Sequence, residues 1–147
     1  MMRNLVTCLL LLFATSAMLL SATSAIAGNN AGYEMGGRYG RFDPVVAQYN
    51  RSGELFRIEG HCQSSCTLFL AIRNVCIDPG ATLLFHSARD PGTANVSPRL
   101  TTHMLAAYNG RLRSYVTANH YMDTLEFHSI SGGDMIRKFG YRACPRE

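Results

Sequence analysis

The first 27 residues most constrain what this chain can become, because they have the pattern of a secretory signal peptide. One positive side chain, Arg3, precedes an apolar run from Leu5 to Leu20. Small residues follow, and Ala25 and Ala27 occupy the two positions that signal peptidase requires. A retained membrane anchor is the alternative, but a spanning helix needs about 20 predominantly apolar residues, and hydroxyl residues dilute the second half of this run. We therefore expect cleavage near Ala27, a periplasmic or secreted location, and no stable membrane anchor after cleavage.

Cleavage leaves residues 28–147 as a single domain, which is long enough for one modest hydrophobic core. The whole chain has a formal net charge of +4, and the signal peptide carries only one of these charges. A charge this small is not typical of proteins that bind nucleic acids or other polyanions. We therefore expect no nucleic-acid partner.

Four cysteines remain in the mature chain, an even number in a compartment that permits oxidation: Cys62, Cys66, Cys76 and Cys144. Zinc ligands usually come as two closely spaced pairs, whereas the last two cysteines each stand alone. We therefore predict disulfide bonds, and neither a metal site nor another cofactor. Four cysteines allow three pairings. A bond from Cys62 or Cys66 to Cys76 is plausible, because the segments that carry them are expected to be neighbours.

Short apolar strands alternate with helical patterns along the mature chain, which predicts an α/β fold with a small parallel sheet and helices packed on it. The expected strands are 55–59, 75–77 and 81–86, and the expected helices are 43–50, 65–72, 97–119 and a short one that ends at Gly140. Residues 28–40 and 88–97 are expected to be loops, whereas 123–130 is ambiguous. The helix over 65–72 is apolar on all sides and should pack against the sheet.

Reactive groups follow the expected ends of two strands, where parallel α/β sheets place their functional residues. Ser64 and Ser65 lie where the turn after Gly60 enters the buried helix, beside the unpaired N–H groups of its first turn. His86 ends the next apolar strand, so the topology can bring it to the serines. A serine here is also typical of an ordinary helix cap, and a histidine of a structural residue.

A pair of glycines, Gly36 and Gly37, lies in the first expected loop. Paired glycines let backbone N–H groups turn inward as an oxyanion hole, although an ordinary linker has the same composition.

Several segments of the chain resemble, in order and spacing, the Clp-protease-like branch of the ClpP/crotonase superfamily. Met35–Gly37 stands where that family has its Pro-Gly-Gly oxyanion loop. Gly60–Leu68 resembles the nucleophile turn Gly-x-Ala-x-Ser-x-Gly, with cysteine at two of the small-residue positions. Arg73–His86 resembles the strand–turn–strand that ends in the catalytic histidine, and Ile130–Gly140 resembles the closing segment. The resemblance covers roughly residues 35–142.

The resemblance implies a peptidase-like serine hydrolase in which Ser64 attacks an amide or ester carbonyl while His86 takes its proton. Backbone N–H groups near Gly36, Gly37 and Ser65 would form the oxyanion hole. Only the alignment separates Ser64 from Ser65 as the nucleophile. A peptide or protein is the implied substrate. Clp-type peptidases assemble into rings, which raises a homo-oligomer as an expectation, but an exported location would deny ATP to a partner ATPase.

The chain departs from the family pattern in two places. Only residues 28–34 precede the glycine loop, so we expect the N-terminal strand–helix unit of the fold to be missing. The acid that normally orients the histidine aligns at or near His128, which cannot act as an anion. Asp123, Glu126 and Asp134 are the other candidates for this third position, and a Ser/His dyad can also function alone. The alternative function is a catalytically silent fold that serves binding or envelope structure.

Overall fold

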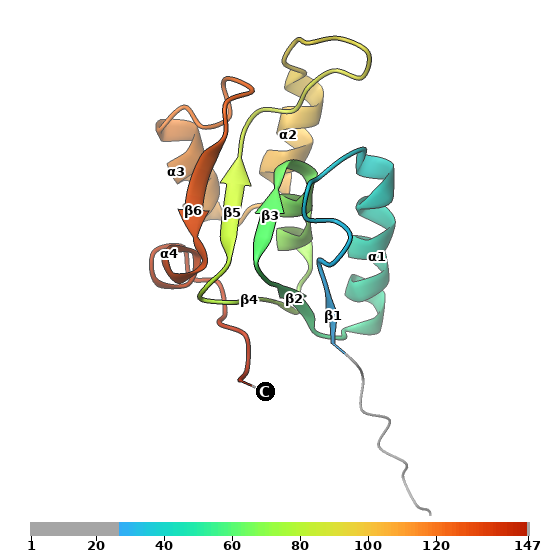
Figure 1. The fold of residues 1–147 in the computed structure, drawn as a ribbon, viewed down its shortest axis with the longest axis vertical. Helices are drawn as coiled ribbons and strands as arrows, with labels where there is room; N and C mark the ends of the chain where they lie inside the picture. The colour runs from blue at the N-terminus through green and yellow to red at the C-terminus, as the bar shows by residue number, and fades with distance from the viewer. Residues whose placement is uncertain (1–26, 147) are drawn as a thin grey trace, which may run out of the picture.

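The computed structural model describes residues 27–146, and Figure 1 shows their arrangement. The predicted signal peptide lies outside the described residues, apart from Ala27. No helix within residues 27–146 is long and apolar enough to cross a membrane. Along the chain the elements are β1 (Gly28–Asn29), η1 (Tyr39–Arg41), α1 (Asp43–Ser52), β2 (Phe56–Ile58), β3 (His61–Gln63), η2 (Ser64–Ala71), β4 (Val75–Ile77), β5 (Thr82–Phe85), α2 (Pro98–Ala106), α3 (Gly110–Ala118), β6 (His128–Ser131) and α4 (Gly132–Arg137).

The domain contains two three-stranded sheets. The chain runs through two successive units, β2–β3–η2 and β4–β5–α2, and in each unit the first strand joins the first sheet and the second strand joins the second sheet. β2 and β4 pair in parallel in the first sheet, with β1 parallel to β2. β3 and β5 pair in parallel in the second sheet. The α/β class and the parallel pairing are therefore confirmed. β6 adds an antiparallel strand beside β5, in the segment that the sequence left ambiguous.

The strand β3 was not predicted, because the residues after Gly60 were interpreted as a turn. Gly60 has φ +57°, a left-handed conformation that glycine adopts without steric cost, and it redirects the chain from the first sheet into the second. His61–Gln63 then pairs with Thr82–Leu84. Three residues are too few to display the alternation of apolar and polar side chains that predicts a strand. This strand is therefore recognised only from its pairing with β5.

Two helix predictions need correction. The helix expected over 97–119 is two helices, α2 and α3, because the Asn109 side-chain oxygen accepts a hydrogen bond from the Leu112 N–H (3.0 Å) and starts a new helix. Both helices bury apolar residues, so the periodicity continues across the break. The buried helix expected over 65–72 is η2, a 3-10 helix, since an apolar composition does not distinguish the two hydrogen-bonding patterns.

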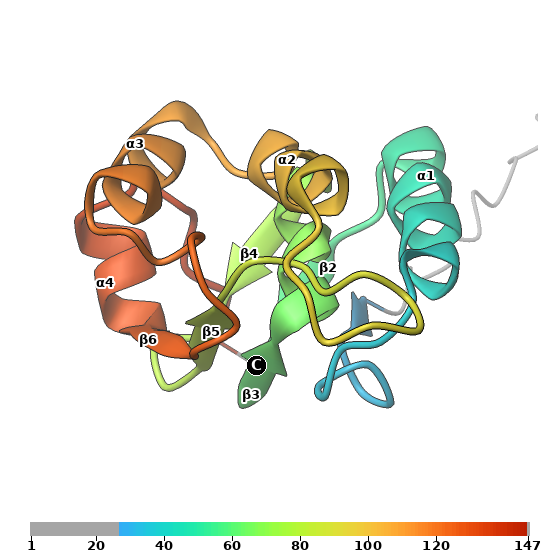
Figure 2. The ribbon, with the colours of Figure 1, turned by 90° about the horizontal axis from the view of Figure 1, so that it is seen from above.

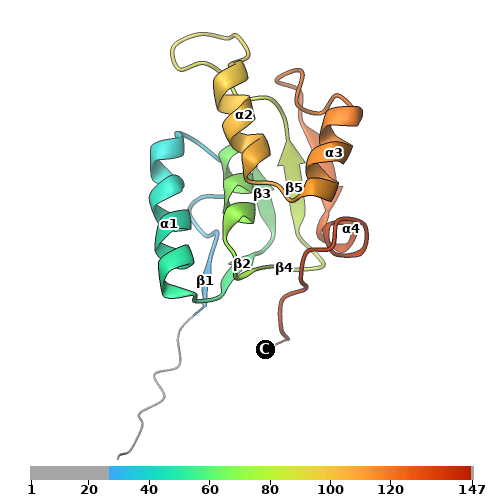
Figure 3. The same cartoon turned by 180° about the vertical axis from the view of Figure 1, so that it is seen from behind.

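A row of helices covers one face of the second sheet (Figures 2 and 3), and the hydrophobic core lies between them and extends to the buried residues of β2 and β4 in the first sheet. The strand residues that point to the helices are buried: Cys62, Leu83, Phe85 and Ile130. Their neighbours on the other face, such as Thr82 and Ser129, are exposed. η2 runs through the middle of the core, where the Phe69 ring contacts those of Phe42 and Phe56 at 5.4 and 4.6 Å between centroids.

Two disulfides join Cys62 to Cys66 and Cys76 to Cys144. The prediction of disulfides is confirmed, but the suggested bond from Cys62 or Cys66 to Cys76 is wrong. β3 and β4 belong to different sheets, and the C-terminal segment instead runs beside β4, where the Cys144 N–H donates to the Ile77 carbonyl (3.0 Å). Disulfides persist in oxidising compartments, which fits a periplasmic or secreted protein.

Candidate active site

Ser64 occupies the turn from β3 into η2 with a left-handed backbone, at φ 56°. Among the described non-glycine residues, only His120 shares a positive φ. This conformation costs a residue with a Cβ about 1–2 kcal/mol. Such strain persists only where the surrounding structure enforces it, and it clusters at active sites and ligand clamps. The turn therefore presents one serine in an enforced conformation.

The predicted glycine pair lies directly against this serine. A Cβ built on Gly36 would stand 2.8 Å from the Ser64 Cβ and 2.9 Å from the Gln63 carbonyl oxygen, closer than real Cβ atoms approach. The Gln63 N–H donates to the Glu34 carbonyl (2.8 Å), which fastens the glycine loop to the edge of β3. Only glycine fits at position 36, and the loop is held where its backbone can reach a group bound at Ser64.

The two neighbouring serines have different surroundings. The Ser65 hydroxyl is buried and donates to the Gly37 carbonyl at 2.6 Å. The Ser64 hydroxyl is partly exposed and has no hydrogen-bond partner within residues 27–146. Ser65 therefore anchors the glycine loop, whereas the Ser64 hydroxyl is available for chemistry.

The backbone N–H groups near Ser64 differ in whether they already donate a hydrogen bond. The Gly36 N–H is already donated to the Tyr33 carbonyl (3.0 Å), so it is not an oxyanion donor in this conformation. The Gly37 N–H has no partner in the described part of the chain, and the Ser65 N–H lies in the first turn of η2, where helix geometry leaves N–H groups unpaired. The donors left for an oxyanion are those of Gly37 and Ser65.

His86 directly follows β5, the strand that pairs with β3. In the parallel pairing Gln63 lies opposite Leu84, so Ser64 and His86 both come within two residues of the last paired residues of these strands. The His86 side chain is buried, and neither ring nitrogen has a hydrogen-bond partner among the described residues. Histidine and serine thus follow the same end of two paired strands, and no hydrogen bond joins them in this structure. An unpaired buried polar group is rare in folded proteins, and a catalytic role is one of its recognised explanations.

The pKa of His86 is lowered from its ordinary value of 6.5, first because burial disfavours the charged imidazolium and also because Arg89 is positively charged. The adjacent Ser87 backbone, which is near the ring without meeting hydrogen-bond geometry, acts in the opposite direction. The Phe127 ring packs edge-on against the imidazole, with centroids 4.5 Å apart. His86 is consequently neutral at pH 7, which is the state that accepts a proton.

None of the four residues considered for the third catalytic position forms a hydrogen bond with His86: Asp123, Glu126, His128 and Asp134. The two aspartates pair instead with basic side chains close to them in sequence, at 2.7–2.9 Å. The His128 ring stacks on Tyr121, and Glu126 is exposed. Within residues 27–146, therefore, no carboxylate is hydrogen-bonded to His86.

Sequence reasoning missed four residues around the site. Thr67 donates a hydrogen bond to the Ser64 carbonyl (2.7 Å), and its hydroxyl is also bonded to that of Tyr108 (2.7 Å). Met35 and Phe127 are exposed beside the site, at 70 and 46%. Tyr108 had only the signal of an apolar helix position, and Phe127 lies in the segment that showed no clear pattern.

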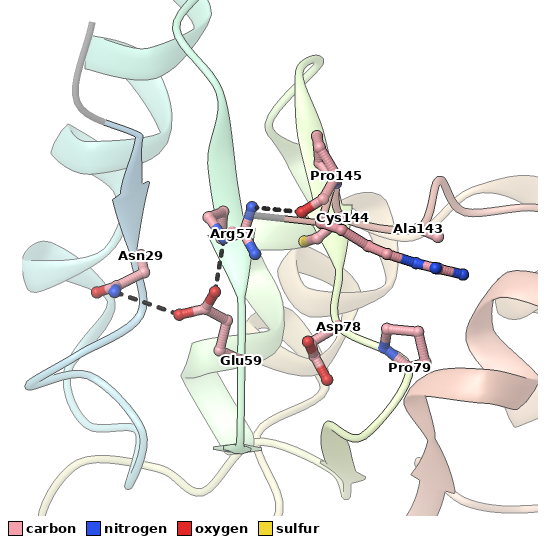
Figure 4. A pocket seen from close by; sticks show the side chains of 9 residues that line it. Asn29, Arg57, Glu59, Asp78, Pro79, Ala143, Cys144 and Pro145 are labelled. Carbon is pink, nitrogen blue, oxygen red and sulfur yellow. Dashed lines mark hydrogen bonds and ion pairs between the residues drawn. The ribbon is translucent and has the colours of Figure 1, made fainter.

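A separate hollow lies over the first sheet, away from Ser64 (Figure 4). Several polar groups that line it form hydrogen bonds with one another. Glu59 accepts hydrogen bonds from Arg57 (2.6 Å) and from Asn29 (3.4 Å). Arg57 also donates to the Pro145 carbonyl (3.2 Å). These contacts, with the nearby Cys76–Cys144 bond, attach the C-terminal segment to the first sheet. The hollow contains none of the predicted catalytic or oxyanion-hole residues.

The chemistry available at the Ser64 site is that of a hydroxyl nucleophile, a neutral imidazole and two unpaired backbone donors. Within residues 27–146 no group of three or more histidine, cysteine or acidic side chains is arranged to hold a metal ion. No protein-family model matches the chain, and no curated protein matches it with significance.

Proposed function

We propose that this protein is an exported serine hydrolase of the Clp-protease-like type, in which Ser64 is the nucleophile and His86 the general base. One observation carries the proposal: the left-handed Ser64 is held against Gly36 at the end of β3, and a buried histidine without a hydrogen-bond partner follows β5, the strand paired with β3. Glycine loop, serine turn and histidine come from three separate segments of the chain. All three lie toward one end of the second sheet, which supports an acyl-transfer site, since an ordinary helix cap needs neither the glycine loop nor the histidine.

The reaction follows from the groups present. His86 turns one ring nitrogen toward Ser64, takes the hydroxyl proton, and the oxygen attacks the carbonyl carbon of the substrate. The N–H groups of Gly37 and Ser65 stabilise the oxyanion. His86 then gives its proton to the leaving amine or alcohol, and an acyl-enzyme remains. Water, deprotonated by the same histidine, attacks the ester carbon and releases the acid and Ser64.

The surroundings of the dyad indicate the class of substrate. The described residues include three exposed large apolar side chains: Met35, Tyr115 and Phe127. Two of them flank the site, because Met35 precedes the glycine loop at the edge of β3 and Phe127 contacts His86 beside β5. Exposed apolar side chains at a site indicate an apolar ligand group. We infer an ester or amide whose acyl part is apolar, as in a peptide with an aliphatic side chain beside the scissile bond.

A serine-directed fluorophosphonate probe tests the nucleophile. We expect the mature protein to be labelled and Ser64→Ala to show no labelling, because the reactive oxygen is gone. Ser65→Ala is the matched control and should still label, since that hydroxyl only anchors Gly37. Labelling is read by intact-protein mass spectrometry, with circular dichroism to establish folding. A folded wild-type sample that takes up no probe, or a Ser64→Ala sample that does, contradicts the proposal.

Acyl selectivity is expected to depend on the two flanking side chains. Because each buried methylene contributes about 0.8 kcal/mol, the wild type should prefer p-nitrophenyl butyrate to the acetate roughly tenfold in kcat/KM. The Met35→Ala/Phe127→Ala variant should lose most of this preference. Tyr115→Ala removes an exposed aromatic ring elsewhere and should keep it. Equal selectivity in all three proteins would show that the substrate does not contact these side chains.

A second candidate function, binding without turnover, is favoured by the isolation of His86, which has neither Ser64 nor a carboxylate as a hydrogen-bond partner. Such a protein would hold a ligand between the glycine loop and Phe127 and leave it intact. The probe separates the two candidates, because a binding protein does not form a covalent adduct at Ser64.

A further inference from the structure

The Cys62–Cys66 disulfide brackets the proposed nucleophile. Cys62 lies in β3 and Cys66 in η2, their Cα atoms are 5.2 Å apart, and Ser64 is the middle residue of the short loop they close. Both cysteine side chains are fully buried in the core. The bond therefore ties the end of the strand to the start of the helix across the turn whose conformation is strained.

We propose that the Cys62–Cys66 disulfide is a positioning element that holds Ser64 in its reactive left-handed conformation, so that the serine is a competent nucleophile only while this pair is oxidised. The inference rests on the proposed function for its catalytic consequence. Its conformational part, the effect of the bond on the Ser64 backbone, does not depend on catalysis.

The left-handed backbone of Ser64 needs such a restraint. A residue with a Cβ disfavours this conformation, and the right-handed and extended regions are its ordinary alternatives. The other restraints are non-covalent: the hydrogen bond from Thr67 to the Ser64 carbonyl, and the close approach of Gly36. Both can be lost by a small shift of the turn. The disulfide limits that shift, because it fixes the distance between the residues on either side of Ser64.

The second disulfide provides the contrast. Cys76 and Cys144 are 68 positions apart, whereas Cys62 and Cys66 are four apart. In the chain-entropy account a cross-link stabilises a fold by restricting the unfolded chain, and the effect grows with the length of the closed loop. The long loop therefore restricts the unfolded chain much more. The short loop contributes least to global stability, which leaves local geometry around Ser64 as its main effect.

Reduction has the same consequence as removal. A dithiol reductant supplies two electrons and two protons, the Cys62–Cys66 bond becomes two thiols, and the reductant becomes a disulfide. The sulfurs are then free to separate, and the turn can relax away from the left-handed region.

The test compares two variants of the mature chain: Cys62→Ala/Cys66→Ala and the matched Cys76→Ala/Cys144→Ala. We expect the first to remain folded by circular dichroism, to label with fluorophosphonate at least tenfold more slowly, and to lose kcat with little change in KM. The second should have the lower melting temperature and label at the wild-type rate at low temperature. Wild-type labelling by folded Cys62→Ala/Cys66→Ala overturns the positioning role.

A conformational readout separates this inference from the proposed function. The backbone chemical shifts and HN–Hα coupling of Ser64 report its φ by NMR, whether or not the protein labels. Ser64 should leave the left-handed region in Cys62→Ala/Cys66→Ala and stay there in Cys76→Ala/Cys144→Ala. An unchanged φ in both overturns the inference. If the first variant does not fold, dithiol reduction of the second, which retains only the Cys62–Cys66 bond, supplies the same comparison.

Discussion

A His86→Ala variant is expected to hydrolyse p-nitrophenyl butyrate about 10³-fold more slowly than the wild type, within the range for loss of a general base. Ser64 would then have no group beside it to take its proton. The measurement is kcat/KM at pH 7, with His103→Ala as the control. His103 is also a histidine, but it is exposed and paired with Asp43 at 3.0 Å on the helical side of the domain. A loss smaller than threefold in His86→Ala would assign the base to another residue.

The pH dependence of the wild type is the second readout of the same prediction. Only neutral imidazole accepts the serine proton, and burial lowers the pKa of His86 below 6.5. The neutral form therefore persists as the pH falls, and kcat/KM should reach half its plateau below pH 6.5. Phe127→Ala exposes the ring to water and should move this midpoint upward. A wild-type midpoint above pH 6.5 would contradict the assignment of His86.

Phe69→Ala is expected to lower the free energy of unfolding by about 3–5 kcal/mol, the usual cost of removing a buried phenylalanine ring. Phe69 is fully buried on η2 and contacts the rings of Tyr33, Phe42 and Phe56, which come from three other segments. The cavity therefore opens where the glycine-loop side of the chain, α1 and the first sheet meet.

Chemical denaturation followed by circular dichroism measures this effect. Phe127→Ala is the matched control, because its ring is 46% exposed and its removal should cost less than about 1 kcal/mol. Similar losses in the two variants would mean that η2 is not the centre of the core.

Helix ends that are set by residues within a few positions of one another could be predicted from the sequence. Helix α1 begins at Asp43, has Pro44 in its first turn and ends at Gly53, which has φ 72° as a helix-ending glycine should. Ser131 accepts a hydrogen bond from the Asp134 N–H (3.1 Å) and caps α4, the short helix expected before Gly140. These elements could be predicted because the interactions that define their ends lie within a few positions.

Predictions failed where partners lie far apart in the sequence. The cysteine pairing depends on which sheet each strand joins, and no local pattern encodes that choice. The break between α2 and α3 was hidden because both helices bury apolar residues, so the helical period continues past Asn109. Two candidates for the third position contact side chains close in sequence instead of His86: Asp123 pairs with His120, and His128 stacks on Tyr121.

The sequence by itself determined the α/β class, the oxidised state of its cysteines and the residue types available for acyl transfer, because each follows from composition or short-range order. Only the tertiary structure decided how those residues meet. The glycine loop packs Gly36 against Ser64, the pairing of β3 with β5 sets which residues follow each strand, and Phe127 packs against the imidazole of His86. The left-handed Ser64 likewise exists only because the loop, the helix and the Cys62–Cys66 bond enclose its turn. Contacts between distant segments depend on register and packing, which the order of residues along one segment does not specify.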